Sequence, residues 1–353
     1  MNLTEYRTLG RSGLVVSPLT LGTMTFGTPR WGSSDEESEA IFRAYVEAGG
    51  NFIDTANVYA KGRSEELVGQ YVAAAGLRDQ LVLATKSGFH SGQPGNPHGG
   101  GNGRKNINQA LESSLRRLQT DYVDLYWVHV WDMVTPVEEV LQTLGDLVRA
   151  GKIRYFAFSD VPAWYAAKAT TLAAAHHVPG PIALQLEYSL VERHIENEHV
   201  PAARECGLGI TPWSPLAAGF LAGKYQRAAN SGAKASGEGR LTGPNPFQDS
   251  KFTEHNWRVL AVVQEVARAL NRPAAQVALA WVLAQPGITS VILGASKRTQ
   301  LLDNLAALDL HLSPEHLRQL QEASALAPVF PYGIFTPAIH KGIFGGTSVQ
   351  GWQ

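Results

Sequence analysis

Short apolar runs alternate with amphipathic segments along most of the chain, and this alternation limits the possible folds more than any other feature of the sequence. Eight runs have the length of buried strands, at residues 19–22, 51–54, 81–85, 122–129, 153–159, 182–187, 209–213 and 291–294. Segments with helical spacing lie between or after them, at residues 34–48, 64–75, 106–118, 136–150, 162–176, 196–206, 257–270, 273–284 and 298–307. Strands alternating with helices predict a parallel sheet covered by helices. Eight units favour a closed (β/α)8 TIM barrel over an open doubly wound sheet.

The chain length and the N-terminal residues complete the predicted architecture. A chain of 353 residues with 44% hydrophobic residues can bury one large core. We therefore expect a single domain over residues 1–353, with the barrel core at about 17–310 and a C-terminal helix and tail at 311–353. Residues 6–16 contain Gly10 and Gly13 and predict a β-hairpin that precedes the barrel and closes its bottom.

Two long polar segments interrupt the repeat after strands, and a third forms the C-terminal tail. Residues 90–104 are rich in glycine, residues 225–256 are long and polar, and residues 327–353 carry several aromatic side chains. The first two follow strands, which places them at the C-terminal face where barrel active sites form. Structureless loops of this length favour a functional role, and tolerated insertion is the alternative.

Composition excludes several classes of partner and cofactor. The formal net charge is −1, so no global basic field predicts nucleic-acid binding. Cys206 is the only cysteine, which excludes an intrachain disulfide and a cysteine zinc cluster. No G-x-G-x-x-G or P-loop motif occurs, so neither a Rossmann nor a P-loop nucleotide site is predicted. No H-E-x-x-H motif occurs either, and no metal site is predicted. The first residues show no apolar signal and no stretch has the length of a membrane span, so we expect a cytoplasmic protein without a membrane partner.

Four polar residues follow three neighbouring predicted strands. Asp54, Lys86 and His129 stand at strand ends, and Tyr59 lies just beyond Asp54. Each has an ordinary structural explanation when taken alone, such as a turn cap or a solvated loop lysine. Together they form a proton-donating set, because a lysine ammonium lowers the pKa of a nearby phenol and a carboxylate keeps that ammonium charged. An imidazole beside them can bind a substrate oxygen, which predicts proton donation to a carbonyl group.

The same stretches resemble those of the aldo-keto reductases. The matching motifs lie at residues 52–59, 62–66, 84–86, 121–129, 151–154, 185–189, 211–216, 293–296 and 303–305, and the resemblance covers about residues 6–320. The motifs are most similar to bacterial members that also resemble potassium-channel β subunits. The resemblance implies that Tyr59 is the general acid, Lys86 modulates its pKa, Asp54 is the partner of the lysine, and His129 orients the carbonyl group.

The resemblance also implies a nicotinamide cofactor extended across the barrel top. Ser159, Asp160 and Gln185 would hold the carboxamide, although the family most often has Asn where this chain has Asp160. Trp213 would stack on the nicotinamide ring, and a packed rim aromatic is the alternative for that residue. The residues expected along the pyrophosphate are Ser214, Leu216 and Gly219, with Arg240 of the long loop as a candidate phosphate contact.

The segment after the eighth strand predicts the choice of cofactor. Ser296, Lys297 and Arg298 offer a hydroxyl group and two cations beside Gly294 and a helix start, which suits the 2′-phosphate of NADP(H). No acidic residue lies between positions 294 and 302, whereas a site for NAD would more commonly offer one to the ribose. In the family, residues equivalent to Gln300 and Asn304 meet the adenine.

The leading hypothesis is an NADPH-dependent reductase of aldehydes or ketones, reversible toward alcohol oxidation. A cofactor-binding regulatory module resembling channel β subunits is the first alternative, and a lyase or aldolase that uses Lys86 as a Schiff base is the second. The candidate pocket walls are the tail aromatics together with Met24, Phe26, Phe89 and Trp131, which predict a hydrophobic carbonyl or alcohol substrate. The sequence leaves the oligomeric state open, a homo-oligomer included.

Overall fold

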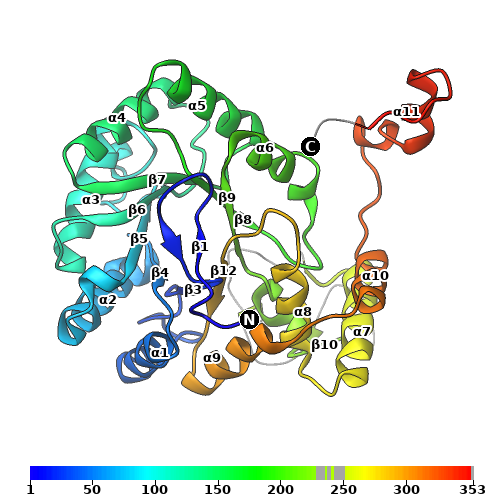
Figure 1. The fold of residues 1–353 in the computed structure, drawn as a ribbon. Helices are drawn as coiled ribbons and strands as arrows, with labels where there is room; N and C mark the ends of the chain where they lie inside the picture. The colour runs from blue at the N-terminus through cyan, green and yellow to red at the C-terminus, as the bar shows by residue number, and fades with distance from the viewer. Residues whose placement is uncertain (228–234, 237–239, 242–250, 351–353) are drawn as a thin grey trace.

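A computed structural model describes residues 1–227, 235–236, 240–241 and 251–350, and its centre is an eight-stranded parallel barrel (Figure 1). The strands are β3 (Leu19–Gly22), β4 (Phe52–Asp54), β5 (Val82–Ser87), β6 (Val123–Val128), β7 (Ile153–Ser159), β8 (Ala183–Glu187), β9 (Gly209–Trp213) and β12 (Val291–Gly294). They pair in the order β12-β3-β4-β5-β6-β7-β8-β9. A parallel bridge between Ile210 and Ile288 joins the two edges, and the Thr289 N–H donates to the Ile210 carbonyl at 2.8 Å. The predicted (β/α)8 TIM barrel is thereby confirmed.

Helices surround the barrel and lie within three residues of their predicted ends. They are α1 (Asp35–Glu47), α2 (Arg63–Ala75), α3 (Arg104–Leu118), α4 (Val137–Arg149), α5 (Ala163–Ala175), α6 (His199–Cys206), α7 (Glu254–Ala269), α8 (Ala274–Leu283) and α9 (Arg298–Leu305). The start of α1 is typical, because the Ser34 side chain accepts a hydrogen bond from the Glu37 N–H at 3.3 Å. Such a cap satisfies one of the free donors in the first helical turn.

The N-terminal hairpin closes the bottom of the barrel, as its position predicted. Strands β1 (Arg7–Thr8) and β2 (Val15–Val16) pair antiparallel. Leu9 and Val16 are fully buried in one cluster with inward-facing residues of β4 to β8. Gly10 adopts a positive φ of 62°, and a Cβ atom there would lie 2.3 Å from the Ile182 carbonyl oxygen. Only glycine fits this approach of the hairpin to the barrel floor.

Alternation along the strands determines which side chains reach the opposite end of the barrel. In β5 the apolar residues Val82 and Ala84 belong to the interior cluster, and Lys86 is the next residue with the same orientation. Successive side chains of a strand point to opposite faces, so every second residue points inward. The interior is therefore apolar at the hairpin end and becomes polar at the carboxyl ends of the strands.

The C-terminal part leaves the barrel after α10 (Pro314–Ala323). The chain then runs to the short helix α11 (Pro337–Ile343), which Figure 1 shows away from the barrel. Every described residue from Gly333 to Gln350 is exposed, and Phe335 is 71% exposed. The described tail therefore supplies no wall of a buried pocket, contrary to the prediction, and Trp352 lies outside the described residues. Among the helices the structure describes, none is both long and apolar enough to cross a membrane.

Candidate active site

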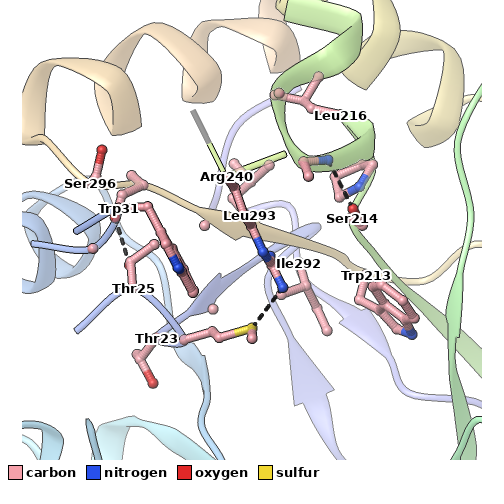
Figure 2. A pocket seen from close by; sticks show the side chains of 18 of the residues that line it. Thr23, Thr25, Trp31, Trp213, Ser214, Leu216, Arg240, Ile292, Leu293 and Ser296 are labelled. Atoms are coloured by element: carbon pink, nitrogen blue, oxygen red, sulfur yellow. Dashed lines mark hydrogen bonds between the residues drawn. The ribbon is translucent and has the colours of Figure 1, made fainter. Parts of the chain in front are cut away.

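A cavity of about 1280 Å³ opens at the carboxyl ends of the barrel strands. Its walls come from the loops after the strands, from the start of α9 and from Arg240. Figure 2 shows Trp31 and Ser296 on one side, Trp213 and Ser214 on the other, and Arg240 between them. The volume exceeds the roughly 300–1,000 Å³ of sites for drug-sized ligands, so an extended ligand can enter.

A buried lysine joins three groups at the inner end of this cavity. Lys86 is fully buried, and its Nζ contacts the Asp54 carboxylate at Oδ1. The same Nζ donates to the Thr55 carbonyl at 2.8 Å and to the Tyr59 hydroxyl at 3.2 Å. Asp54 is itself buried, and its Oδ2 accepts a bond from Gln185 Nε2 at 3.0 Å. Every donor of the ammonium group is thus directed at a named oxygen.

The backbone determines the position of the phenol. Tyr59 begins the short 3-10 segment Tyr59–Gly62, in which Ala60 and Lys61 have positive φ angles of 47° and 58°. Positive φ is strained for residues that have a Cβ atom, and such residues cluster at functional sites. The same conformation occurs at Asp160 and Ser214, which line the cavity. The loops around the cavity therefore hold their side chains at an energetic cost.

His129 completes the inner end of the cavity. It follows β6, and its backbone N–H donates to the Ser87 carbonyl at 2.8 Å. Its ring lies edge-on to Tyr59, with centroids 5.9 Å apart, and edge-on to Phe89 at 4.8 Å. Its Nδ1 is buried without a hydrogen-bond partner among the described residues. Burial, together with the charge of Lys86, holds the pKa of His129 well below its usual value, so the imidazole is neutral at pH 7.

Burial also controls the protonation of the other groups. Burial raises the pKa of the Tyr59 phenol, and the nearby Lys86 ammonium offsets only part of this increase. The Lys86 ammonium and burial thus act in opposite directions on the pKa of this phenol, and burial has the larger effect. Burial alone would lower the pKa of Lys86, but the facing Asp54 carboxylate raises it above its ordinary value. Burial raises the pKa of Asp54, against the effect of Lys86.

The residues expected around a nicotinamide ring line one wall. Ser159 is buried, and its Oγ has no hydrogen-bond partner in the described structure. Asp160 Oδ1 accepts a bond from Trp213 Nε1 at 3.1 Å, which fixes the plane of the indole. Although the Asp160 side chain still touches solvent, removal of water by the surrounding protein raises its pKa to about 6. An ionised aspartate accepts the indole N–H well, which explains why an acid is compatible with this position.

The residues expected along a pyrophosphate lie above this wall. Ser214 Oγ accepts the Ala218 N–H at 3.1 Å, and Leu216 and Gly219 line the cavity beside it. Arg240 reaches into the cavity: its guanidinium lies over the Trp31 ring at 4.8 Å, and its Nη2 lies 3.4 Å from Met24 Sδ (Figure 2). Other residues of the loop around Arg240, at 228–234, 237–239 and 242–250, lie outside the described residues.

The far end of the cavity is formed by β12 and α9. Gly294, Ser296, Lys297, Gln300 and Asn304 line it. The Ser296 N–H and hydroxyl both donate to Gln300 Oε1, at 3.0 and 3.3 Å. Asn304 is buried, and its Nδ2 has no hydrogen-bond partner within the described part of the chain.

Comparison with known proteins identifies the family to which this chain belongs. The profile of the Aldo/keto reductase family matches residues 18–325. The chain belongs to the aldo/keto reductase family. It is therefore an oxidoreductase of a family that acts on small-molecule carbonyl substrates and generally uses NAD(P)H.

Three relatives show the range of proteins similar to this aldo/keto reductase. A probable voltage-gated potassium channel subunit beta of Oryza sativa is 36% identical, over 90% of this chain and 95% of that protein. A norsolorinic acid reductase of Aspergillus flavus is 35% identical, over 93% and 83%. An aryl-alcohol dehydrogenase [NADP(+)] of Phanerodontia chrysosporium is 34% identical, over 92% and 86%. The resemblance to the family is thus confirmed over nearly the whole chain.

The cavity of this aldo/keto reductase fits a dinucleotide cofactor. Three buried polar atoms without partners in the described structure lie along it: Ser159 Oγ, His129 Nδ1 and Asn304 Nδ2. Buried polar groups are normally hydrogen-bonded, so unsatisfied ones lining a cavity indicate a missing partner. At Gly294 no atom lies within 4 Å of the place where a Cβ would be, which leaves room beside the backbone. Within the described residues, no group of His, Cys, Asp and Glu side chains could hold a metal ion.

Three predicted site residues lie elsewhere in this aldo/keto reductase. Phe26 is fully buried in the outer core and meets the Tyr71 ring edge-on at 6.3 Å, so it forms no cavity wall. Trp131 packs against Trp164, with centroids 5.6 Å apart, and is also outside the cavity lining. Arg298 begins α9 with its side chain outside the lining. Met24 and Phe89 do line the cavity.

Other residues of the cavity wall were not predicted from the sequence. Thr23, Thr25, Arg30 and Trp31, from the loop between β3 and α1, all line it. Thr25 Oγ1 donates to the Ala295 carbonyl at 2.7 Å, which ties this loop to the β12 end (Figure 2). The position of the loop directly after the first strand is the signal that could have identified these residues.

Proposed function

We propose that this aldo/keto reductase is an NADPH-dependent reductase of aldehydes or ketones, reversible toward alcohol oxidation. The observation that carries the proposal is the contact of one buried ammonium, Lys86 Nζ, with both the Asp54 carboxylate and the Tyr59 hydroxyl. A phenol held next to a cation in a cavity is suited to donate its proton and to remain briefly as a phenolate.

Each residue at the inner end has a role in proton donation. Tyr59 donates its proton to the carbonyl oxygen, and its raised pKa keeps it protonated until substrate is present. Lys86 stabilises the phenolate that forms, and Asp54 keeps Lys86 charged and oriented. His129, neutral because of its lowered pKa, orients the substrate oxygen by a hydrogen bond. When bound, NADPH supplies the hydride to the carbonyl carbon.

The remaining lining residues bind and orient the cofactor. Ser159, Asp160 and Gln185 hold the carboxamide, and the indole of Trp213, fixed by Asp160, packs on the ring. Ser214, Leu216, Gly219 and Arg240 lie along the pyrophosphate. At the α9 end, Gly294, Ser296, Lys297, Gln300 and Asn304 line the cavity and bind the adenosine part. The exposed Arg298 cation at the helix start adds attraction for the 2′-phosphate. The name of the Phanerodontia chrysosporium relative, an NADP(+)-dependent dehydrogenase, supports this choice of cofactor.

The cavity walls indicate an apolar, preferably aromatic, substrate. Phe89 lies edge-on to His129, and Trp31 and Trp213 also line the cavity. Such a surface favours apolar carbonyl compounds over small charged ones. The aryl-alcohol dehydrogenase among the relatives agrees with an aromatic substrate.

A regulatory module is the second candidate, because a probable potassium channel subunit of rice is 36% identical. The complete Asp54, Tyr59, Lys86 and His129 set argues for catalysis. A Schiff-base lysine is not favoured, since Asp54 keeps Lys86 charged, whereas Schiff-base formation needs the neutral amine. We also propose a single-domain cytoplasmic protein, supported by the one cysteine in the chain.

A carbonyl panel tests the proposal. Loss of NADPH absorbance should be observed with aromatic aldehydes or ketones and should be slower with small carboxylated ones. NADPH binding, measured by calorimetry on the same sample, separates the two candidates. Tight binding with no turnover of any carbonyl compound would favour the regulatory module, and absence of both would contradict the proposed function.

A further inference from the structure

A carboxylate from another part of the chain lies at the start of α9. Helices α1 and α9 pack side by side on the barrel (Figure 1). Glu37, the third residue of α1, accepts through Oε1 from the backbone N–H of Arg298, the first residue of α9. The two residues are 261 positions apart, so the sequence near Arg298 gives no sign of this contact.

The contact lies beside residues that line the cavity proposed for the cofactor. The first N–H groups of a helix have no partner within the helix and attract anions. In α9 the first of these groups is bound to a carboxylate, next to Ser296 and Lys297, which line the cavity. Asn304, one of the buried residues with an unsatisfied Nδ2, lies on the same helix and faces the cavity. Residues on both sides of Arg298 thus line the ligand cavity, and the Glu37 carboxylate adds a negative charge beside them.

The cations of this region are not neutralised by Glu37. In the described structure, neither the Lys297 nor the Arg298 side chain forms an ion pair, since Glu37 contacts the backbone alone. Both side chains are exposed. Two cations that attract a phosphate and one carboxylate that repels it therefore stand around the same helix start.

We propose that Glu37 is a specificity-determining residue that weakens binding of the 2′-phosphate of NADP(H) relative to the 2′-hydroxyl of NAD(H). Like charges that share a site repel each other, and a phosphate must displace this carboxylate or bind beside it. A ribose hydroxyl has no such penalty and can donate to a carboxylate. Lys297 and Arg298 act in the opposite direction. The inference rests on the proposed function, because it assumes that the adenosine ribose binds at α9.

Adenosine nucleotides without the nicotinamide measure this effect apart from catalysis. We would compare the calorimetric Kd of 2′,5′-ADP with that of 5′-ADP for the wild type, Glu37→Gln and Glu36→Gln. Glutamine keeps an oxygen that can accept from Arg298 N–H, so the start of α9 should remain intact. Glu36 is exposed and lies one residue earlier in α1, so its variant loses the same charge without this contact.

We expect Glu37→Gln to tighten 2′,5′-ADP on the order of tenfold, the effect of removing one close like charge. The Kd of 5′-ADP should not change, Glu36→Gln should resemble the wild type, and Lys297→Ala should weaken 2′,5′-ADP alone. Equal shifts in Glu37→Gln and Glu36→Gln, or no shift in either, would overturn the inference. If neither nucleotide binds the wild type, the proposed function itself fails, whereas binding of both without a selective shift refutes only the role of Glu37.

Discussion

The two ends of the cavity are built in different ways. At the inner end, Asp54 and Lys86 are buried, and each is bonded to neighbours within the barrel. At the α9 end, Lys297 and Arg298 are exposed, and the carboxylate of Glu37 accepts from the Arg298 backbone N–H. The inner end therefore fixes a geometry, whereas the α9 end sets a balance of charges.

The difference follows from the elements that carry the residues. The inner residues occupy inward positions of paired strands, where Lys86 pairs with Trp127 and Ser159 with Gln185 in the sheet register. A shift by one residue would turn these side chains out of the barrel, so the hydrogen-bonded register protects them. The α9 residues belong to a loop and a helix start on the surface, where single changes are tolerated. The reaction carried out at the inner end should therefore be hard to alter by substitution, whereas the cofactor preference set at the α9 end should be easy to alter.

The largest expected effect is at Tyr59. Tyr59→Phe removes the proton donor and keeps the ring, so kcat should fall by about 10²–10⁴, the usual contribution of general acid catalysis. The Kd of 2′,5′-ADP should stay the same, because the α9 end is independent of the phenol. Steady-state kinetics with calorimetry on the same variant checks both, and near wild-type turnover would remove Tyr59 from the mechanism.

Substitution of one lysine at each end compares how much the two ends contribute to the stability of the folded protein. Lys86→Met leaves Asp54 buried without its cation, which should cost about 3–5 kcal/mol in the free energy of unfolding. It should also raise the pKa of Tyr59 further and slow proton donation, because the cation that offsets burial is lost. Lys297→Ala removes the same charge from an exposed position and should change stability by less than about 0.5 kcal/mol. Urea unfolding measures both, and equal losses would contradict the distinction between the ends.

The smallest effect concerns Asp160, between the two ends. Folding raises its pKa to about 6, so the folded state holds the proton more tightly than the unfolded chain. Its contribution to stability is therefore fully present below the ordinary aspartate pKa and is lost as pH rises through about 6. Asp160→Asn keeps an acceptor for Trp213 and removes this titration.

As pH rises from 4.5 to 7.5, the free energy of unfolding of the variant should increase relative to that of the wild type. This relative gain should be less than about 1 kcal/mol, because the carboxylate still touches solvent. Thermal unfolding at the two pH values measures the gain. A difference between wild type and variant that is the same at both values would show that Asp160 has no shifted pKa.

The local sequence pattern was sufficient to predict the strands and helices of the barrel. The strand over residues 153–159 and the helix over 34–48 could be predicted because apolar periodicity and the Ser34 cap are properties of neighbouring residues. The pocket walls were harder: Phe26 and Trp131 are aromatic residues near strand ends, yet both pack into outer layers. Which side a loop side chain turns to depends on the helices that it meets, and the sequence alone does not give their positions.

The sequence by itself determined the barrel and the convergence of Asp54, Tyr59, Lys86 and His129, because parallel strands all end at one face and every second residue points inward. Only the tertiary structure decided the electrostatics. Burial raises the pKa of Tyr59 despite Lys86, and the packing of α1 on α9 brings Glu37 to a helix start that has no acid nearby in sequence. Solvation and charge depend on distances through space, and residues far apart in the chain set those distances.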